Sequence, residues 1–357
     1  MYQPHSPCRL ASSPRFAASA VVAVLLLVAI PGAALHAQTG DFPAEPPAQP
    51  PADWGPVSIN MEDVPYPFPV NYLEFEIFGK DVRKAYMDVE PTGTPNGQAV
   101  VLFHGAAYYA MYWEPTIESL REAGFRVVAP DLLGWGRSSK PIIPYSLSLH
   151  AGTIERLLDH LGISEAAVVG HSMGGMVATR FALMYPELTT HMVLVNPIGV
   201  QDSRPGWAWQ EPSPDLDYDL QEVYESRVAR EQRVVVDWQP HFLEHVRIHY
   251  GFRQSPDWPR LSYVQSLNSY SRAIDTVIHD WPLIETKTAF LAGEEDGPNY
   301  PEYARNAVDL LPNAELVLWE NIAHNPHLEI PDIFAAELIR FLESDPDESA
   351  RRQTRPR

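Results

Sequence analysis

The segment from residue 170 to 175 (GHSMGG) joins an apolar run to a helix-forming stretch. Residues 166–169 (AAVV) predict a buried strand, and residues 176–183 (MVATRFAL) predict a helix. Glycines two positions before and two after Ser172 remove Cβ atoms that would clash in so tight a reversal, and they leave the Ser172 hydroxyl projecting from a strained turn. The sequence therefore predicts a strand, a sharp turn and a helix, with an exposed serine at the apex.

A nucleophilic serine needs two partners, because an alcohol is a poor nucleophile at neutral pH. A histidine must accept its proton, and an acid must hold that histidine in the right tautomer. Asp296 lies in a turn just after one short apolar run, and His324 follows another such run further on. These two residues are the predicted acid and base, while Glu295 and His327 remain minor alternatives for the same roles.

The order serine, aspartate, histidine, each just past a separate predicted strand, resembles that of α/β-hydrolase-fold enzymes over roughly residues 70 to 343. Residues 104–107 (HGAA) are similar to the oxyanion loop of that family. Residues 131–138 resemble its next turn and residues 323–331 its histidine segment, although Ala323 stands where a glycine often precedes the catalytic histidine. The resemblance is to a lidded serine hydrolase.

The resemblance implies an α/β fold with a mostly parallel central sheet flanked by helices. It also implies that Ser172, Asp296 and His324 form a catalytic triad at the carboxyl edge of the sheet. The backbone N–H groups of Ala106 and Met173 would form the oxyanion hole, so that neither side chain matters for that role.

Other polar residues near these motifs are expected to be structural. His104 and His171 each flank a tight turn, which favours a packing or hydrogen-bonding role, and Asp131 begins a glycine-containing turn. The histidines near the site do not have a metal-binding spacing, and the only cysteine is Cys8. We expect neither a metal nor a cofactor.

About ninety residues separate the predicted strand at 191–196, the sixth, from the one that begins at residue 288. This is far more than a simple crossover requires. We expect a helical lid at about 197–285, rich in aromatic residues and with near-helical apolar spacing over residues 220–250. A largely apolar pocket with few charged groups favours an acyl chain, an aromatic ring or a small neutral ester as substrate.

Both ends of the chain differ from the rest. Residues 1–37 carry arginines, then an apolar run, then small residues, which predicts a secretory signal peptide cleaved after Ala37. The apolar run is short for a membrane anchor, so we expect an exported protein, periplasmic or secreted, with no stable membrane insertion. Residues 38–56 predict an extended or disordered Pro/Ala-rich linker, 57–343 the hydrolase domain and 344–357 a disordered polar tail.

The net charge of −20 argues against nucleic acid or an anionic membrane surface as a partner. A serine hydrolase of carboxylic esters is the first hypothesis. Relatives that cleave carbon–carbon bonds or run cofactor-free perhydrolysis use the same three residues, so these activities stay open. Dehalogenases and epoxide hydrolases of similar fold use an aspartate at the elbow, where this chain has Ser172. A hydrolase-like binding protein is a weaker alternative, because the chain keeps candidates for all three catalytic groups.

Overall fold

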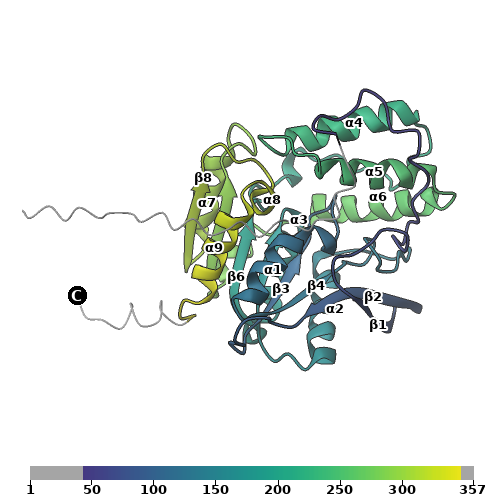
Figure 1. Cartoon of the computed structure of the whole chain (residues 1–357). Coiled ribbons are helices and arrows are strands. Elements are labelled where there is room, and N and C mark those ends of the chain that lie inside the picture. The colour runs from purple at the N-terminus through teal and green to yellow at the C-terminus, as the bar shows by residue number, and fades with distance from the viewer. Residues whose placement is uncertain (1–42, 347–357) are drawn as a thin grey trace, which may run out of the picture. The chain divides into compact units, whose positions relative to one another are not determined.

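The computed structural model describes residues 43–346, which are built around an eight-stranded sheet of order β1-β2-β4-β3-β5-β6-β7-β8 (Figure 1). Strands β3 to β8 run parallel to one another, whereas β2 pairs antiparallel with both β1 and β4. The strands are β1 (Val70–Ile77), β2 (Lys80–Val89), β3 (Ala99–Phe103), β4 (Arg126–Pro130), β5 (Ala166–His171), β6 (Thr189–Val195), β7 (Lys287–Gly293) and β8 (Ala314–Trp319).

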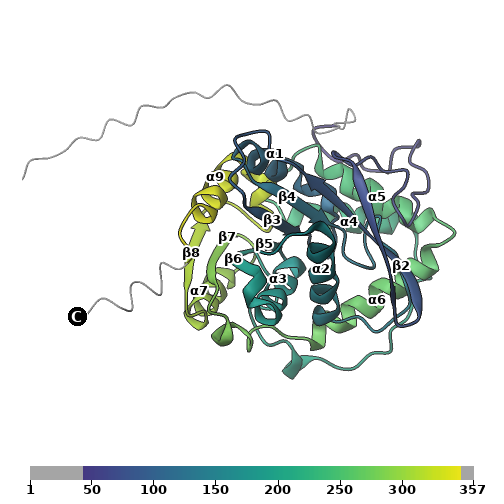
Figure 2. The same cartoon turned by 90° about the horizontal axis from the view of Figure 1, so that it is seen from below.

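Helices cover both faces of this sheet. They are α1 (Glu114–Glu122), α2 (Leu147–Leu161), α3 (Met173–Met184), α4 (Leu220–Arg233), α5 (Phe242–Gln254), α6 (Trp258–Ile274), α7 (Tyr300–Leu310), α8 (Pro326–Glu329) and α9 (Pro331–Leu342). Short 3-10 turns are η1 (Ala110–Trp113), η2 (Pro186–Leu188), η3 (Arg204–Gly206) and η4 (Trp281–Leu283). Helices α1 and α9 lie on one face, and α2, α3 and α7 on the other (Figure 2).

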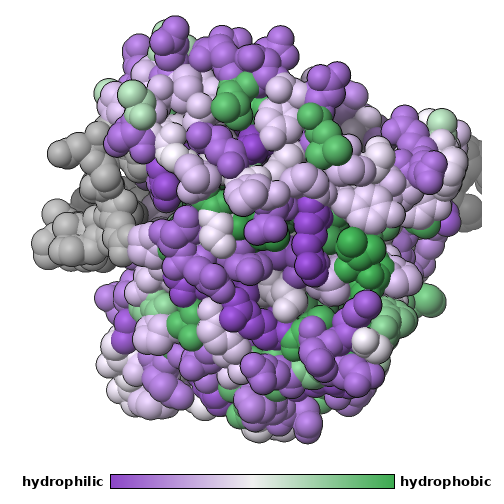
Figure 3. All heavy atoms as spheres, turned by 90° about the vertical axis from the view of Figure 1, so that its right-hand side faces the viewer, coloured by the Kyte–Doolittle hydropathy of each residue, from purple (hydrophilic) through white to green (hydrophobic). Residues whose placement is uncertain are grey.

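The central strands are buried because both faces of the sheet are covered. Every residue of β3 and of β5 is buried, which explains why these strands appear in the sequence as continuous apolar runs rather than alternating patterns. The predicted fold class, an α/β fold with a mostly parallel central sheet flanked by helices, is confirmed. The side of the molecule that carries β1, β2 and the start of α6 is mainly hydrophilic, with scattered hydrophobic side chains (Figure 3).

The segment between β6 and β7 contains α4, α5 and α6, which gather beyond one end of the sheet (Figure 1). The apolar spacing over residues 220–250 belongs to two helices rather than one, since α4 ends before a loop that contains Pro240. This segment contacts loops at the carboxyl ends of the strands. The His324 N–H donates to the Val234 carbonyl (3.1 Å), and His249 Nε2–H donates to the Ala107 carbonyl (2.8 Å).

Residues 43–56 form no helix or strand, yet they pack on the inserted helices. The Trp54 ring lies 5.9 Å from the rings of both Tyr224 and Tyr250, and Tyr224 Oη donates to the Pro47 carbonyl. This part of the expected linker is therefore packed against the inserted segment. The expected signal peptide and residues 347–357 lie outside the described residues. Within residues 43–346, no helix combines the length and apolar character needed to cross a bilayer.

Candidate active site

Ser172 stands between the end of β5 and the start of α3, with φ 54° and ψ −118°. A non-glycine residue rarely adopts this conformation, so it must be enforced by its surroundings. A Cβ on Gly170 would lie 2.1 Å from the Gly174 carbonyl oxygen, and one on Gly174 would lie 2.2 Å from the Phe103 carbonyl oxygen. Both glycines are thus required by close backbone approach, as the elbow motif predicts.

The predicted base and acid meet directly. His324 Nδ1 lies 2.7 Å from Asp296 Oδ2, and the two side chains are only 10% and 16% exposed. Donation of the Nδ1–H to this carboxylate leaves Nε2 as the ring nitrogen able to accept a proton. The geometry therefore favours these two residues as an oriented base and acid.

Asn196, which the sequence analysis did not single out, fixes the Asp296 carboxylate. Its Nδ2 donates to the same Oδ2 at 3.0 Å, and its Oδ1 accepts the Gly293 N–H at 2.9 Å. Asn196 has a positive φ of 36° at the end of β6. The available signal was its position: an asparagine directly after a buried parallel strand lies at the same sheet edge as the other site residues.

The loop that carries His324 is held by a second carboxylate. Glu329 accepts the N–H groups of Ala323 (3.1 Å), Asn325 (3.2 Å) and Val236 (2.8 Å), so it ties this loop to the inserted segment. Burial raises the pKa of Glu329, although these three donors act in the opposite direction. This carboxylate has a structural role in shaping the turn around His324.

His171, directly before Ser172, connects the elbow to the His324 loop. Its Nε2–H donates to the His324 carbonyl (2.8 Å), so Nδ1 is the acceptor for the Tyr112 hydroxyl (2.8 Å). The Tyr112 oxygen in turn accepts the Gly105 N–H at 3.0 Å. Burial lowers the pKa of His171 well below its usual value, which keeps the ring neutral. As expected, His171 is a hydrogen-bonding group, and it links three site loops.

The predicted oxyanion loop follows β3 and is shaped by two further polar residues. His104 donates from Nδ1 to the Gly105 carbonyl (2.8 Å) and accepts the Leu132 N–H at Nε2 (3.0 Å). Asp131 accepts the N–H groups of Ala110 (2.9 Å) and of Arg137 (2.8 Å). Both residues therefore serve the loop conformation, in line with the roles expected from their turn positions.

The two predicted oxyanion donors lie on either side of Ser172. A Cβ on Gly105 would lie 3.2 Å from Ser172 Cβ, which measures how closely the loop before Ala106 approaches the serine. Met173 is the first residue of α3, so its N–H points out of the helix N-terminus. Among the described residues, none accepts a hydrogen bond from the N–H of Ala106 or Met173. Both groups are therefore available to a substrate oxygen.

The alternative acid and base are less well placed. Neither ring nitrogen of the buried His327 has a hydrogen-bond partner within residues 43–346, and its ring packs 4.4 Å from that of Trp113. Burial and the nearby histidines lower its pKa well below the usual value. Glu295 is exposed, and its N–H donates to the Ile322 carbonyl. The geometry favours His324 and Asp296 over both.

The inserted segment also brings charged side chains toward the site, which the expectation of few charged groups missed. Arg227, Arg230 and Glu231 lie on α4, and Arg272 lies on α6. Glu231 is buried, accepts the Tyr108 hydroxyl at 2.9 Å and pairs with Arg230 at 2.8 Å. The available signal was the spacing of these α4 residues, which matches the buried face of that helix.

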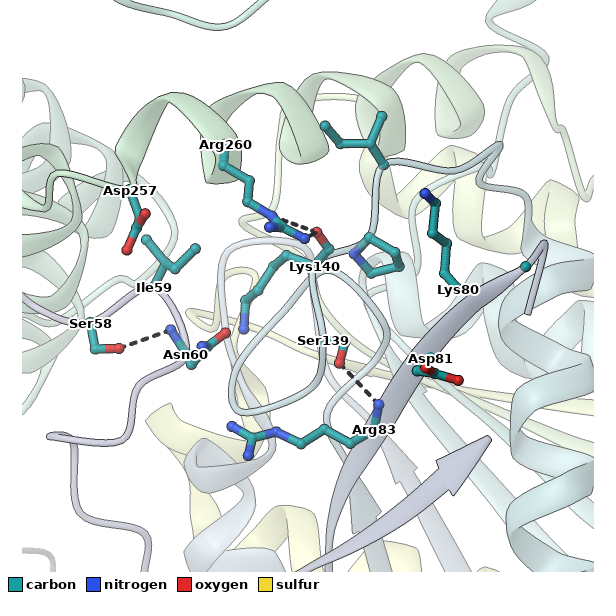
Figure 4. A pocket seen from close by; sticks show the side chains of 13 residues that line it. Ser58, Ile59, Asn60, Lys80, Asp81, Arg83, Ser139, Lys140, Asp257 and Arg260 are labelled. Carbon is teal, nitrogen blue, oxygen red and sulfur yellow. Dashed lines mark hydrogen bonds between the residues drawn. The ribbon is translucent and has the colours of Figure 1, made fainter. Parts of the chain in front are cut away.

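A separate surface pocket of about 870 Å³ lies between β2 and the start of α6 (Figure 4). It contains none of the predicted catalytic residues, and its lining mixes cationic side chains such as Lys80 and Arg260 with Asp81 and Asp257. Burial lowers the pKa of Lys140, at its wall, to about 7. Within residues 43–346, no group of three histidine, cysteine or acidic side chains is placed to hold a metal ion.

The chain is similar to known hydrolases in both sequence and fold. Residues 98–237 match the family model described as "alpha/beta hydrolase fold". A solved structure of a probable hydrolytic enzyme from Pseudomonas aeruginosa is 30% identical and superposes with a TM-score of 0.75, covering 82% of this chain and 99% of that one. An esterase from Exiguobacterium antarcticum, 19% identical with a TM-score of 0.59, covers 74% of this chain and 96% of its own, and shares the fold.

Curated relatives match over shorter stretches. A haloalkane dehalogenase from Mycolicibacterium paratuberculosis is 33% identical over 38% of this chain and 45% of its own length. A 2-hydroxy-6-oxononadienedioate/2-hydroxy-6-oxononatrienedioate hydrolase from Burkholderia vietnamiensis is 40% identical over 33% of this chain and 41% of its own. The chain thus spans less than half the length of these curated relatives.

Proposed function

Since the chain belongs to the α/β-hydrolase fold family, we propose that it is a serine hydrolase that cleaves carboxylic esters of small or medium apolar substrates. Ser172 attacks the ester carbonyl while His324 accepts the hydroxyl proton, and Asp296 holds the imidazole in the required tautomer. The protonated imidazole then donates to the departing alcohol. Water, activated by the same histidine, releases the acyl group from Ser172.

One observation carries this proposal. A strained serine at the start of α3 is combined with a histidine whose Nδ1 is bound to a carboxylate at 2.7 Å. The N–H groups of Ala106 and Met173 are proposed to stabilise the negative charge that develops on the carbonyl oxygen. This chemistry needs no cofactor.

Carbon–carbon bond hydrolysis is the second candidate, because the Burkholderia vietnamiensis relative is named for such a dioate substrate class. The same three residues would serve it, and also cofactor-free perhydrolysis. Other relatives are named haloalkane dehalogenase and bifunctional epoxide hydrolase. Enzymes of those two classes use an aspartate at the elbow, and Ser172 offers no carboxylate to be alkylated.

A fluorophosphonate probe tests the role of Ser172. We expect it to label the wild-type protein at Ser172, and we expect Ser172→Ala to lose labelling and about 10⁶ in turnover if the three residues act as a unit. Ser203→Ala, at an exposed serine of the inserted segment, is the matched control and keeps both. A wild-type protein that is folded but neither labelled nor active on any ester would refute the proposal and favour a binding protein.

Substrate panels separate the two enzymatic candidates. p-Nitrophenyl esters of increasing acyl length measure ester hydrolysis, a ring-cleavage diketone measures carbon–carbon hydrolysis, and a peroxide assay measures perhydrolysis. We expect the highest kcat/KM on a short or medium ester. A diketone preferred over every ester by more than tenfold would move the assignment to the second candidate.

The N-terminal sequence supports a further proposal, that the protein is exported. Cleavage after Ala37 would leave a mature chain that begins at Gln38. Mass spectrometry of the protein recovered from the periplasm or medium should show that start. Recovery of uncleaved chain in the cytoplasm alone would contradict it.

A further inference from the structure

Three half-buried arginines lie on the inserted helices α4 and α6, and two of them contact residues around the predicted catalytic side chains. Arg227 and Arg230 lie three residues apart on α4 and so share one face of that helix. Arg272 reaches the same region from the last turn of α6. Burial lowers the pKa of both Arg227 and Arg272, and the positive charge of Arg230 is the second cause in each case.

Arg272 contacts the nucleophile elbow itself. Its Nη1 lies 4.0 Å from Met173 Sδ, and its Nη2 donates to Ser269 Oγ at 2.8 Å. Met173 directly follows Ser172 and supplies one of the two proposed oxyanion N–H groups. The guanidinium therefore contacts the side chain of the residue that follows the proposed nucleophile.

Arg230 approaches from the His324 side. Its guanidinium carbon lies 5.7 Å from the centre of the Tyr108 ring, and the Tyr108 hydroxyl accepts a hydrogen bond from Asn325 Nδ2 at 3.2 Å. Asn325 is the residue after His324. Arg272 thus contacts the residue after the proposed serine, and Arg230 contacts a tyrosine that is hydrogen-bonded to the residue after the proposed base.

The third guanidinium, that of Arg227, lies one turn before Arg230 on the same face of α4. Burial raises the pKa of Tyr109, two residues after the predicted oxyanion loop, and the charge of Arg227 offsets part of this rise. Burial, and after it the charges of Arg230 and Arg253, lower the pKa of Arg227 itself to about 10. The site is therefore bordered by cationic groups that repel one another.

Negative charge inside the protein does not balance this cluster. Arg230 pairs with Glu231, but Arg227 and Arg272, both half-buried, form no ion pair with a carboxylate among residues 43–346. Exposed arginines of the same segment do find partners: Arg204, for example, binds Asp202 at 2.6 Å. A guanidinium that is half removed from water and has no carboxylate partner costs folding free energy. An anionic ligand bound at this position would supply the missing partner.

We propose that the substrate carries a carboxylate, which Arg227 and Arg272 bind, with Arg230 beside them, while its scissile carbonyl lies against Ser172. The planar guanidinium matches a carboxylate in a bidentate arrangement, which orients as well as attracts it. This inference rests on the proposed hydrolase function and narrows it, from an apolar ester to an apolar ester with an acidic end. The overall charge of −20 repels anions, so only a local cluster of this kind can favour one.

A pair of esters that differ only in this charge tests the inference. The substrates are mono-p-nitrophenyl adipate and its methyl ester, with p-nitrophenolate release corrected for spontaneous hydrolysis. We expect the acid to be preferred in kcat/KM by roughly tenfold or more, as hydrogen bonds to a charged group imply. Added salt should reduce the preference. Arg227→Gln and Arg272→Gln should each lower the acid-to-methyl-ester ratio several-fold, and the double variant should abolish it.

Arg204→Gln is the matched control, because it removes one positive charge from an exposed position of the same segment; it should keep the wild-type ratio. A wild-type ratio of one or less, or a ratio that survives in the double variant, overturns the inference. If Ser172 is still labelled by the fluorophosphonate and the methyl ester still turns over, the proposed function stands without it.

A binding measurement separates the inference from catalysis. Monomethyl adipate should bind Ser172→Ala more tightly than dimethyl adipate does in calorimetry. Introducing Arg227→Gln and Arg272→Gln into that background should remove the difference. Equal binding of the two compounds by Ser172→Ala contradicts the carboxylate site whatever the enzyme assays show.

Discussion

The contact between Gly174 and the loop after β3 can be tested by adding one methyl group. In Gly174→Ala, the new Cβ would lie 2.2 Å from the Phe103 carbonyl oxygen and 2.9 Å from the His104 carbonyl oxygen. Both neighbours are backbone atoms, so no side-chain rotation can relieve the clash. The elbow and the oxyanion loop have to separate by roughly 1 Å, a displacement that can cost about 10² in rate when it misplaces a catalytic group.

We therefore expect Gly174→Ala to lose about 10² in kcat/KM and 1–3 kcal/mol of unfolding free energy, roughly the usual cost of overpacking. Initial rates on a p-nitrophenyl ester and urea unfolding measure the two effects. Gly152→Ala is the matched control: it lies inside α2, where the nearest atom to an added Cβ is Tyr185 Oη at 3.6 Å. It should keep full activity and gain about 0.5–1 kcal/mol from higher helix propensity. Wild-type activity and stability in Gly174→Ala would refute the close-approach explanation.

Three further changes test other parts of the structure. Asn196→Ala should lower kcat about tenfold with little change in KM, because Asp296 loses one donor and the Gly293 N–H its acceptor; unchanged kcat would contradict this role. His327→Leu should keep most of the activity and leave thermal stability unchanged or higher, since both ring nitrogens lack partners, whereas a loss equal to that of His324→Gln would make His327 the base. Burial lowers the pKa of Lys84 to about 7, so the unfolded chain binds more protons than the folded protein between pH 7 and 10, and stability rises with pH over that range. Lys84→Met should flatten this rise by up to about 1.4 kcal/mol per pH unit, measured by urea unfolding at several pH values. An unchanged slope would contradict the burial effect.

Local pattern predicted much of the fold. The apolar runs before Ser172, Asp296 and His324 are buried parallel strands in the structure, because a strand covered on both faces needs continuous apolar residues. The glycines of residues 170–175 predicted a tight turn, since only glycine tolerates such close backbone contacts. The sequence did not predict the helix boundaries in the inserted segment, because the near-helical spacing of apolar residues continues across the loop that follows α4.

The amino-acid sequence by itself determined the α/β architecture and the chain order of the three candidate catalytic residues, because both depend on local hydrophobicity, turn chemistry and succession along the chain. Tertiary structure alone decided which side chains touch: that Asn196 holds Asp296, that His171 connects Gly105 to the His324 loop, and that Arg272 contacts Met173 of the elbow. These hydrogen bonds join residues about 100 to 150 positions apart, and their partners follow from how the strand ends, loops and inserted helices are placed at the sheet edge. A one-dimensional pattern carries the periodicity of each element, but it does not encode the orientation of one element against another.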